Sequence, residues 1–358
     1  MNPRILMFCS SVALLAGTTQ LAYAHANFKD QITEGAVATW NAVAINHGCN
    51  TNVGGEDNGA PYKDVIALSV VFPNSTNFSD VIMRGTKSSN APVVYTDPGD
   101  DPSNSAAGDI LSDLSAHLVQ AGTSSNGLPL TMGLSLINTG GVMFANNIPI
   151  VDGNGAIRGW QSWSGTSPYS GSALLETAKT AAGDTITQTG FAPFGIGAFQ
   201  FQPISCAKTL KIRVAVADWC AKGAASYKDS GRVDVWIGSM TTKFNDSTTM
   251  PNPDATPVYW PTITVNRDLA KNPLPGTKGF NATTGTVIDR TVAGWTTGTK
   301  DASGNPVMST KIACNQSTDY DTVYIEPSNN DIDKYLPISA AKYPAGANGS
   351  LYWPTLAK

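Results

Sequence analysis

Histidine is the side chain of this sequence best suited to metal chemistry, and it is scarce. Only three histidines occur in 358 residues, and all three, His25, His47 and His117, lie in the first third of the chain. Neutral imidazoles suit copper, zinc and nickel. A histidine at the mature N-terminus could also give its amino nitrogen and its ring nitrogen to one ion, an arrangement that suits copper. We therefore take His47, His117 and His25 as candidate metal ligands, against the competing interpretation of ordinary structural histidines.

The first 24 residues predict where this chemistry would take place. Arg4 precedes an apolar run, and Ala22-Tyr23-Ala24 is a typical cleavage site, so residues 1–24 resemble a secretory signal peptide. Cleavage there makes His25 the first mature residue, whereas the alternative cut after Ala26 removes it. No other run approaches the ~18 apolar residues of a membrane helix. We expect a monomeric exported protein without a membrane span, secreted, periplasmic or peripherally associated with the outer membrane and its proteins.

Export makes the cysteines informative. Cys49, Cys206, Cys220 and Cys314 remain after cleavage, and an even number in an oxidising compartment predicts two disulfides. The alternating segment 208–218 predicts a strand between Cys206 and Cys220, which would hold them well over ~20 Å apart. A disulfide needs Cα atoms within about 7 Å. We expect Cys49 to pair with one of these two cysteines and Cys314 with the other, which would also hold the turn after His47.

The elements that must position these residues are mainly strands. Gly, Pro, Asn, Ser and Thr are abundant, and short alternating or apolar runs recur, which favours an all-β fold, an antiparallel β-sandwich with long irregular loops and few short helices. Residues 109–120 and 171–182 are the helix candidates. We assign residues 25–245 to the sandwich domain and 246–358 to a Pro/Thr/Asn-rich extension packed on it. The predicted strands are 37–45, 64–73, 209–217, 232–237, 258–265 and 322–325.

Other classes of function lack a sequence signature. The sequence has no G-x-S-x-G, CxxC, HExxH, P-loop or GxGxxG motif, and a net charge of −4 gives no basic face for nucleic acid. We therefore expect a binding protein rather than an enzyme. The alternatives are a structural or adhesive surface protein without a metal, and a copper oxygenase with an N-terminal histidine. Calcium is a weaker alternative to copper, at Asp97–Asp101 with Asp109, or at Asn330–Asp333.

Several blocks of the sequence resemble a known family. They are AHANFKDQITEG from Ala24, INHGC at 45–49, DVIALSVVFPN at 64–74, the segment 190–220 that contains SCAKTLKIRVAVADWC, and VDVWI at 233–237. Over about residues 24–245 they resemble the CorA/MopE group, copper-repressible, surface-associated copper-binding proteins of methane-oxidising bacteria. The N-terminal histidine and HGC block are more distantly similar to YcnI-like copper-handling domains.

The resemblance implies a copper-binding protein that acts in copper acquisition or homeostasis at the cell surface, with the ion as Cu+ or Cu2+. The family site uses two imidazoles and a kynurenine formed from tryptophan, which implies His47 and His117 as the imidazoles here. The kynurenine does not carry over, because the nearest tryptophan, Trp40, lies seven residues before His47. On one unbroken strand that odd spacing puts the two side chains on opposite faces. His25 is then the substitute third donor.

Overall fold

The structure is a computed structural model, and it confirms the predicted all-β fold. Among the described residues the elements are strands, with one short helix. The described residues are 26–35, 37–45, 65–74, 81–87, 118–120, 134–136, 144, 146–153, 155, 157–163, 178–179, 185–186, 190–220, 232–237, 241–242, 260–310, 313–315 and 319–336.

The N-terminal sheet consists of strands β1, β3, β12 and β7, paired in that order. Strand β3 is buried from Asn41 to Ile45 and pairs antiparallel with β12 over its whole length, from Thr39 opposite Ile196 to Ile45 opposite Gly190. Strand β1 pairs with the other side of β3, with Asn27 opposite Ala44. The bounds are Asn27–Phe28 for β1, Thr39–Ile45 for β3, Gly190–Ile196 for β12 and Ser135–Leu136 for β7.

The antiparallel sheet has the order β16, β15, β4, β9, β8. Strand β4 is its central strand, as its unbroken apolar sequence predicts, and residues 67–71 of it are buried. The bounds are Arg232–Trp236 for β16, Ala215–Cys220 for β15, Val65–Val71 for β4, Ile157–Trp163 for β9 and Asn146–Val151 for β8.

The mixed sheet has the order β2, β17, β14, β22, β5 and contains two parallel pairs, β14 with β22 and β17 with β2. Strands from both sides of residue 245 therefore share one sheet, because β17 and β22 flank β14. Pro261 comes directly before β17, where it interrupts no ladder. The bounds are Ile32–Thr33 for β2, Thr262–Asn266 for β17, Thr209–Arg213 for β14, Tyr320–Pro327 for β22 and Val81–Lys87 for β5.

One stretch of chain belongs to two sheets. The segment predicted as a single strand at 209–217 is divided at Val214, so that β14 lies in the mixed sheet and β15 in the antiparallel sheet. The Val214 amide donates to the Pro261 carbonyl at 2.9 Å. Residues 210 and 212–217 are all buried, which places this passage in the core shared by the two sheets.

An aromatic cluster packs the N-terminal sheet against the antiparallel sheet. Phe194 of β12 lies 5.3 Å from Phe72 and 5.1 Å from Trp160 of β9, measured between ring centroids. Phe28 of β1 adds an edge-on contact with Phe194 at 5.8 Å. Large buried aromatic rings dominate core energetics, so these side chains provide much of the attachment between the two layers.

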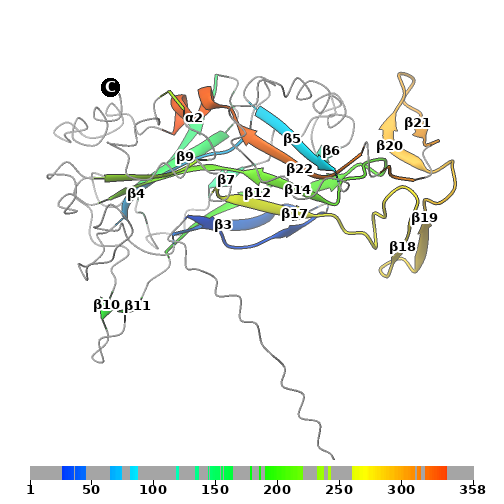
Figure 1. The fold of residues 1–358 in the computed structure, drawn as a ribbon, viewed down its shortest axis with the longest axis horizontal. Coiled ribbons are helices and arrows are strands. Elements are labelled where there is room, and N and C mark those ends of the chain that lie inside the picture. Colours follow the sequence, from blue (N-terminus) through cyan, green and yellow to red (C-terminus); the bar gives the residue numbers. More distant parts are fainter. Residues whose placement is uncertain are drawn as a thin grey trace, which may run out of the picture.

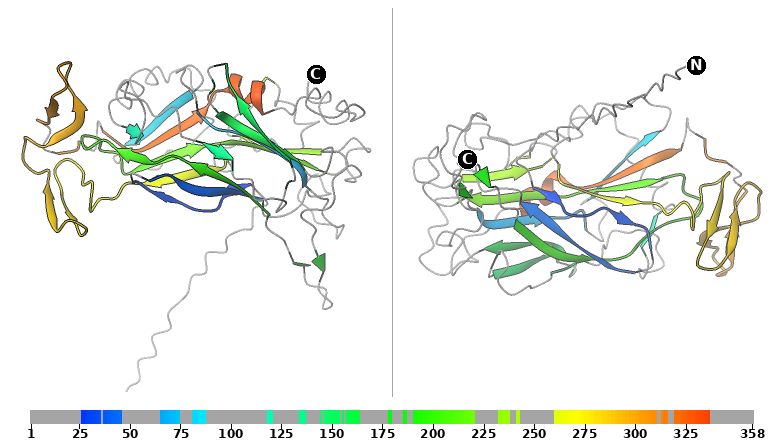
Figure 2. Two further views of the ribbon diagram at one scale, coloured as in Figure 1. Left: turned by 180° about the vertical axis from the view of Figure 1, so that it is seen from behind. Right: turned by 90° about the horizontal axis from the view of Figure 1, so that it is seen from below.

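Two hairpins project at one end of the molecule, beyond the ends of the sheet strands (Figures 1 and 2). Two shorter strand pairs, β13 with β6 and β10 with β11, complete the described strands. The hairpin bounds are Lys278–Asn281 for β18 with Thr286–Asp289 for β19, and Thr296–Lys300 for β20 with Pro306–Met308 for β21. The short pairs are Phe199–Phe201 for β13 with Leu118–Gln120 for β6, and Ala178–Lys179 for β10 with Thr185–Ile186 for β11.

The helix predictions are wrong where the structure describes their residues. Residues 118–120, at the end of the first candidate, form β6, and residues 178–179, within the second, form β10. At these positions the chain pairs with β13 and β11 as strands, although the spacing of its apolar residues is helical. The remainder of both candidates lies outside the described residues.

Helix α2, Asn329–Tyr335, was not predicted. Ser328 caps it by accepting a hydrogen bond from the Asp331 amide at 3.2 Å. The Asp331 carboxylate forms an ion pair with Arg158 of β9, and both side chains are buried. This pair attaches the helix to the antiparallel sheet. It also occupies one of the carboxylates that we considered for calcium, and Asp333, the other, accepts a hydrogen bond from Thr241.

Candidate functional site

The three candidate histidines, His47, His117 and His25, lie outside the described residues, but the strands beside them in sequence are described. His25 is two residues before β1, His47 is two residues after β3, and His117 directly precedes β6. The pairing of these strands therefore indicates from which part of the fold the chain leads to each histidine.

The β1–β3 pairing brings the approaches to two of these histidines together. Asn27 of β1 lies opposite Ala44 of β3, and the strands run antiparallel. Directly opposed residues in such a pair have Cα atoms about 4.5–5.5 Å apart. Ala26 and Ile45, the last described residues on either side, are both buried. The chain therefore leads to His25 and His47 from the same end of the N-terminal sheet.

The strand that directly follows His117, β6, pairs with a different part of the fold. Leu118 of β6 pairs with Phe201 of β13, whereas Ile45 pairs with Gly190 at the start of β12. Strand β12 advances about 20 Å between Gly190 and Ile196, at 3.3–3.4 Å per residue. Strand β13 starts only after that far end. The chain therefore leads to His117 from beyond the Ile196 end of β12. It leads to His25 and His47 from the Gly190 end.

Trp40, the tryptophan nearest to His47 in sequence, lies on β3 with about half of its surface exposed. The Lys29 ammonium sits 4.8 Å from the centre of its ring, a cation–π contact. Strand β3 is unbroken from Thr39 to Ile45, and alternation on it puts Trp40 and Ile45 on opposite faces.

Cys206 and Cys314 form a disulfide with their Cα atoms 5.8 Å apart. This confirms the prediction that Cys206 does not pair with Cys220. The Asp319 carboxylate lies 3.3 Å from the Cys206 sulfur, so two sulfurs and a carboxylate are grouped as in a metal site. A bridged cysteine offers no thiolate, however, and the thiolate is the form that binds metal. Cys49 lies outside the described residues, and the second bridge stays a prediction.

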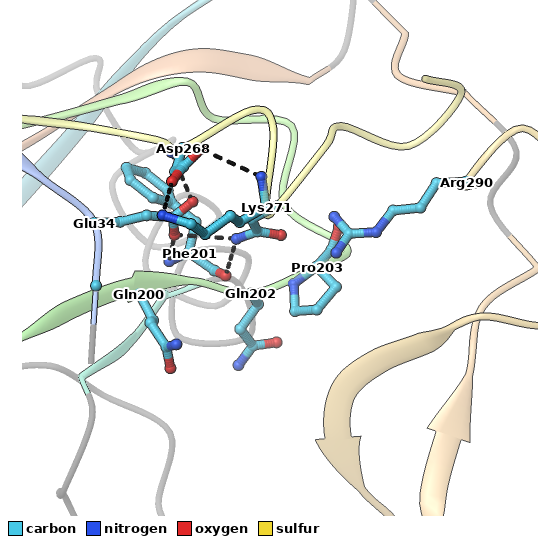
Figure 3. Close-up of a pocket in the computed structure, with 10 residues that line it drawn as sticks. Glu34, Gln200, Phe201, Gln202, Pro203, Asp268, Lys271 and Arg290 are labelled. Atoms are coloured by element: carbon cyan, nitrogen blue, oxygen red, sulfur yellow. Dashed lines mark hydrogen bonds and ion pairs between the residues drawn. The ribbon is translucent and has the colours of Figure 1, made fainter. Parts of the chain in front are cut away.

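A cavity of about 570 Å³ is lined by described polar side chains, and it was not predicted. Glu34, which follows β2, is one of the residues that line it (Figure 3). The Glu34 Oε1 atom accepts from the Asp268 amide at 2.9 Å, and Oε2 accepts from the Phe201 amide at 2.8 Å and from Asn272 Nδ2 at 3.0 Å. Burial raises the pKa of Glu34, and these three hydrogen bonds together with the charge of Arg267 oppose that rise.

Arg267 is the cation whose charge acts on this carboxylate, and its guanidinium donates hydrogen bonds to backbone carbonyls. Its Nη1 donates to the carbonyl of Ala207 at 3.2 Å and also to that of Ser205, and its Nε donates to the carbonyl of Asn272 at 2.7 Å. Burial lowers the pKa of Arg267 to about 10, while Glu34 opposes that shift. The guanidinium thus fastens the segment after β13 to the turn after β17.

Sequence reasoning missed this network, because Glu34 and Arg267 are 233 positions apart. The available signal was the rarity of glutamate, which occurs only at positions 34, 56, 176 and 326. Two of these four, Glu34 and Glu326, are described, and both take part in buried or part-buried polar networks.

No protein-family model matches the chain, and no curated protein or solved structure matches it. Within the described part of the chain, the only helix is far too short to cross a membrane. The similarity to the copper-binding CorA/MopE group therefore stays a prediction, with support only from the motifs quoted above.

Proposed function

We propose that this protein is an exported copper-binding protein that takes part in copper acquisition or homeostasis at the cell surface. Three features of the sequence support the proposal: the signal-like residues 1–24, the confinement of all histidines to the first third, and the HGC block.

The observation that carries the proposal is the β1–β3 register, with Asn27 opposite Ala44. It favours His25 and His47 as the principal ligands, because neighbouring strands of one sheet lead to both. The buried residues Ala26 and Ile45 anchor these approaches, which lowers the entropy lost when an ion is bound. His117 is the third candidate donor, with a weaker structural argument because of its association with β13.

Copper titration of the mature protein and of single His→Ala variants tests the proposal. His25→Ala and His47→Ala should each weaken copper binding at least about tenfold, as expected for losing one of few ligands. His117→Ala should have a smaller effect, and melting temperatures should stay within a few degrees of the parent. N-terminal sequencing must first show that the mature chain begins at His25. Undiminished copper binding by the His25→Ala, His47→Ala double variant would overturn the proposal.

A structural or adhesive surface protein is the second candidate function. The projecting hairpin β18–β19 favours it, because Phe280 and Val287 lie opposite each other across the strands and both are more than half exposed. Exposed apolar groups on a projection suit contact with another surface. The metal content of protein isolated from its native membrane separates this candidate from copper binding. Ascorbate-driven oxidation of polysaccharide would instead indicate a copper oxygenase.

A further inference from the structure

A smaller cavity, of about 250 Å³, lies beside the Cys206–Cys314 bridge, and both cysteines line it. Its charged lining side chains are Lys208, Asp319 and Asp321, so two carboxylates face one cation. Cys206 is 8 % exposed, whereas Cys314 is half-buried. A small molecule can therefore reach the bridge through the cavity, on the side of Cys314, and the charge of the lining favours a cation.

The Asp319 carboxylate is placed to suit the reduced form of Cys206. Its Oδ2 atom lies 3.3 Å from the Cys206 sulfur, at hydrogen-bond distance for a thiol. A bridged sulfur has no proton to donate, whereas a Cys206 thiol would donate to this oxygen without any movement. The same oxygen accepts from the Asn315 amide at 2.7 Å, which fixes its position. This contact therefore favours the open bridge over the closed one.

The backbone at Cys206 is held by contacts that do not depend on the disulfide. Arg267 Nη1 donates to the carbonyls of Ser205 and Ala207, the residues on either side of Cys206, and the second of these distances is 3.2 Å. Strand β14 starts at Thr209 and is paired on both sides. Opening the bridge would therefore leave this cysteine in place.

The Cys314 side is held in a similar way. The Asp319 amide donates to the Asn315 carbonyl at 2.7 Å, which closes the turn that follows Cys314. The Lys208 amide donates to the Asp321 carbonyl at 2.7 Å and ties this segment to the chain that carries Cys206. The two thiols of the reduced protein would thus stay next to each other and next to the carboxylate.

The three side chains form a group of the size that one metal ion needs. The two sulfurs and an Asp319 carboxylate oxygen all lie within 4.8 Å of one another. Two thiolates on one tetrahedral zinc ion are roughly 3.7 Å apart, as follows from a Zn–S distance of about 2.3 Å. Once the bridge is open, rotation about the Cα–Cβ bonds supplies the required separation. Zinc sites with three protein ligands hold water in the fourth position, and the cavity gives room for it.

We propose that reduction of the Cys206–Cys314 bridge creates a zinc site. The two thiolates and the Asp319 carboxylate hold the ion, and a water molecule in the cavity completes the tetrahedron. While the bridge is closed the site does not exist, because no thiolate is present. The site is independent of the proposed copper ligands.

A small dithiol is the reductant. One of its thiolates attacks the Cys314 sulfur, the more exposed of the two, and forms a mixed disulfide, while Cys206 leaves as a thiolate. The second thiolate of the reductant then displaces Cys314 and closes the reductant's own disulfide. Two electrons pass from the dithiol to the two cysteines, which gain its two protons. Zinc then displaces these protons when it binds.

Cobalt(II), which takes the place of zinc and absorbs light, tests the proposal in the mature protein. After reduction with a phosphine and removal of oxygen, the parent should show thiolate-to-cobalt charge-transfer absorption that zinc abolishes. The oxidised parent should not show it. Histidine-bound cobalt lacks this absorption, so the result does not depend on the copper proposal. Its absence from the reduced parent would overturn the proposal, as would its presence in the oxidised parent.

Asp319→Asn is the decisive variant. Its side-chain oxygen can still accept from the Asn315 amide, so the turn is kept, but a neutral amide is a poor zinc ligand. The zinc affinity of the reduced variant, measured by competition with a chromophoric chelator, should fall at least about tenfold. Asp321→Asn alters a carboxylate that lines the same cavity outside the group of three, and it should bind zinc like the parent. Equal zinc affinity in the Asp319→Asn variant and the parent would overturn the proposal.

The Cys206→Ser, Cys314→Ser variant separates this site from the other cysteines, which reduction also frees. It should lack the charge-transfer absorption, and retention of that absorption would overturn the proposal. Zinc should raise the melting temperature of the reduced parent but not that of this variant, because an ion that binds only the folded form stabilises it. A reduced parent whose melting is unaffected by zinc would also overturn the proposal.

Discussion

Arg213 Nη1 lies 2.5 Å from Glu326 Oε1, and neither side chain is more than 5 % exposed. The pair joins β14 to β22, the parallel neighbours at the centre of the mixed sheet. The guanidinium also lies 4.5 Å from the ring centre of Tyr324 and 5.5 Å from that of Trp260. A buried pair of this kind is far more costly to break than to replace, because one partner alone is an uncompensated charge.

Glu326→Ala should therefore destabilise the protein by about 3–5 kcal/mol, as should Arg213→Ala. The double replacement Arg213→Met, Glu326→Leu should recover much of that loss, because it removes both charges and fills the space. The surface pair Lys278–Asp289, 2.6 Å apart with both groups more than a third exposed, is the matched control. Its double replacement should shift the urea midpoint far less. A Glu326→Ala variant as stable as the parent would contradict the buried pair.

The Cys206–Cys314 bridge spans 108 positions, and closing a loop of that length restricts the unfolded chain strongly. The Cys206→Ala, Cys314→Ala variant should lose about 2–5 kcal/mol of unfolding free energy under non-reducing conditions. Peptide mapping of the parent without reduction should yield the 206–314 pair. The remaining two cysteines then predict a Cys49–Cys220 bridge. A peptide that links Cys206 to Cys220 would contradict both the observed bridge and this assignment.

Glu34 should make stability depend on pH in an unusual direction for an acid. Its pKa is raised on folding, chiefly by burial, so the folded protein holds this proton more tightly than the unfolded chain. Its stabilising contribution is complete below the ordinary pKa of 4.5 and declines as pH rises through the raised value. The stability advantage of the parent over Glu34→Gln should therefore shrink from pH 4.5 upward in paired thermal melts. An advantage that grows with pH would contradict the raised pKa.

Gly159 of β9 should tolerate no side chain. A Cβ atom at this position would overlap the Val70 carbonyl oxygen of the neighbouring strand, and the residue has φ +152°. Gly159→Ala should therefore destabilise the protein by at least about 1–3 kcal/mol through overpacking and backbone strain. Gly153→Ala is the control, because nothing lies within 4 Å of the corresponding Cβ position. Equal chemical denaturation midpoints for the two variants would refute the close approach of β9 to β4.

Hydrophobic patterning identified only part of the strands, and β5, β8, β9 and β12 were not predicted. The segments 64–73 and 232–237 correspond to β4 and β16 within a few residues. Alternation could not reveal the division at Val214, since β14 and β15 continue the same buried pattern in two different sheets. Helix α2 was missed because its seven residues are short and polar, although the Ser328 cap and Asp331 in the first turn were readable signals.

The cavity beside Glu34 could not have been predicted from local sequence. Its walls come from residues near 34, 200, 268 and 290, and only the pairing of β2, β13 and β17 with their partners brings them together. The histidine hypothesis came from composition and from motif resemblance. The β1–β3 register adds a preference for His25 with His47 that spacing alone did not provide.

The position of β22 in the mixed sheet has a consequence for how the chain must fold. This strand lies between β14 and β5 but ends at Pro327, so it is synthesised after every other strand of all three sheets. Strand β5 has no other partner in that sheet until β22 arrives, nearly 240 residues later in translation. Pairings of such long sequence separation form slowly. A nascent chain would therefore remain without its complete sheets until almost all of it had left the ribosome. It would stay incompletely folded, and so could still pass through a narrow channel, for as long as it is being made.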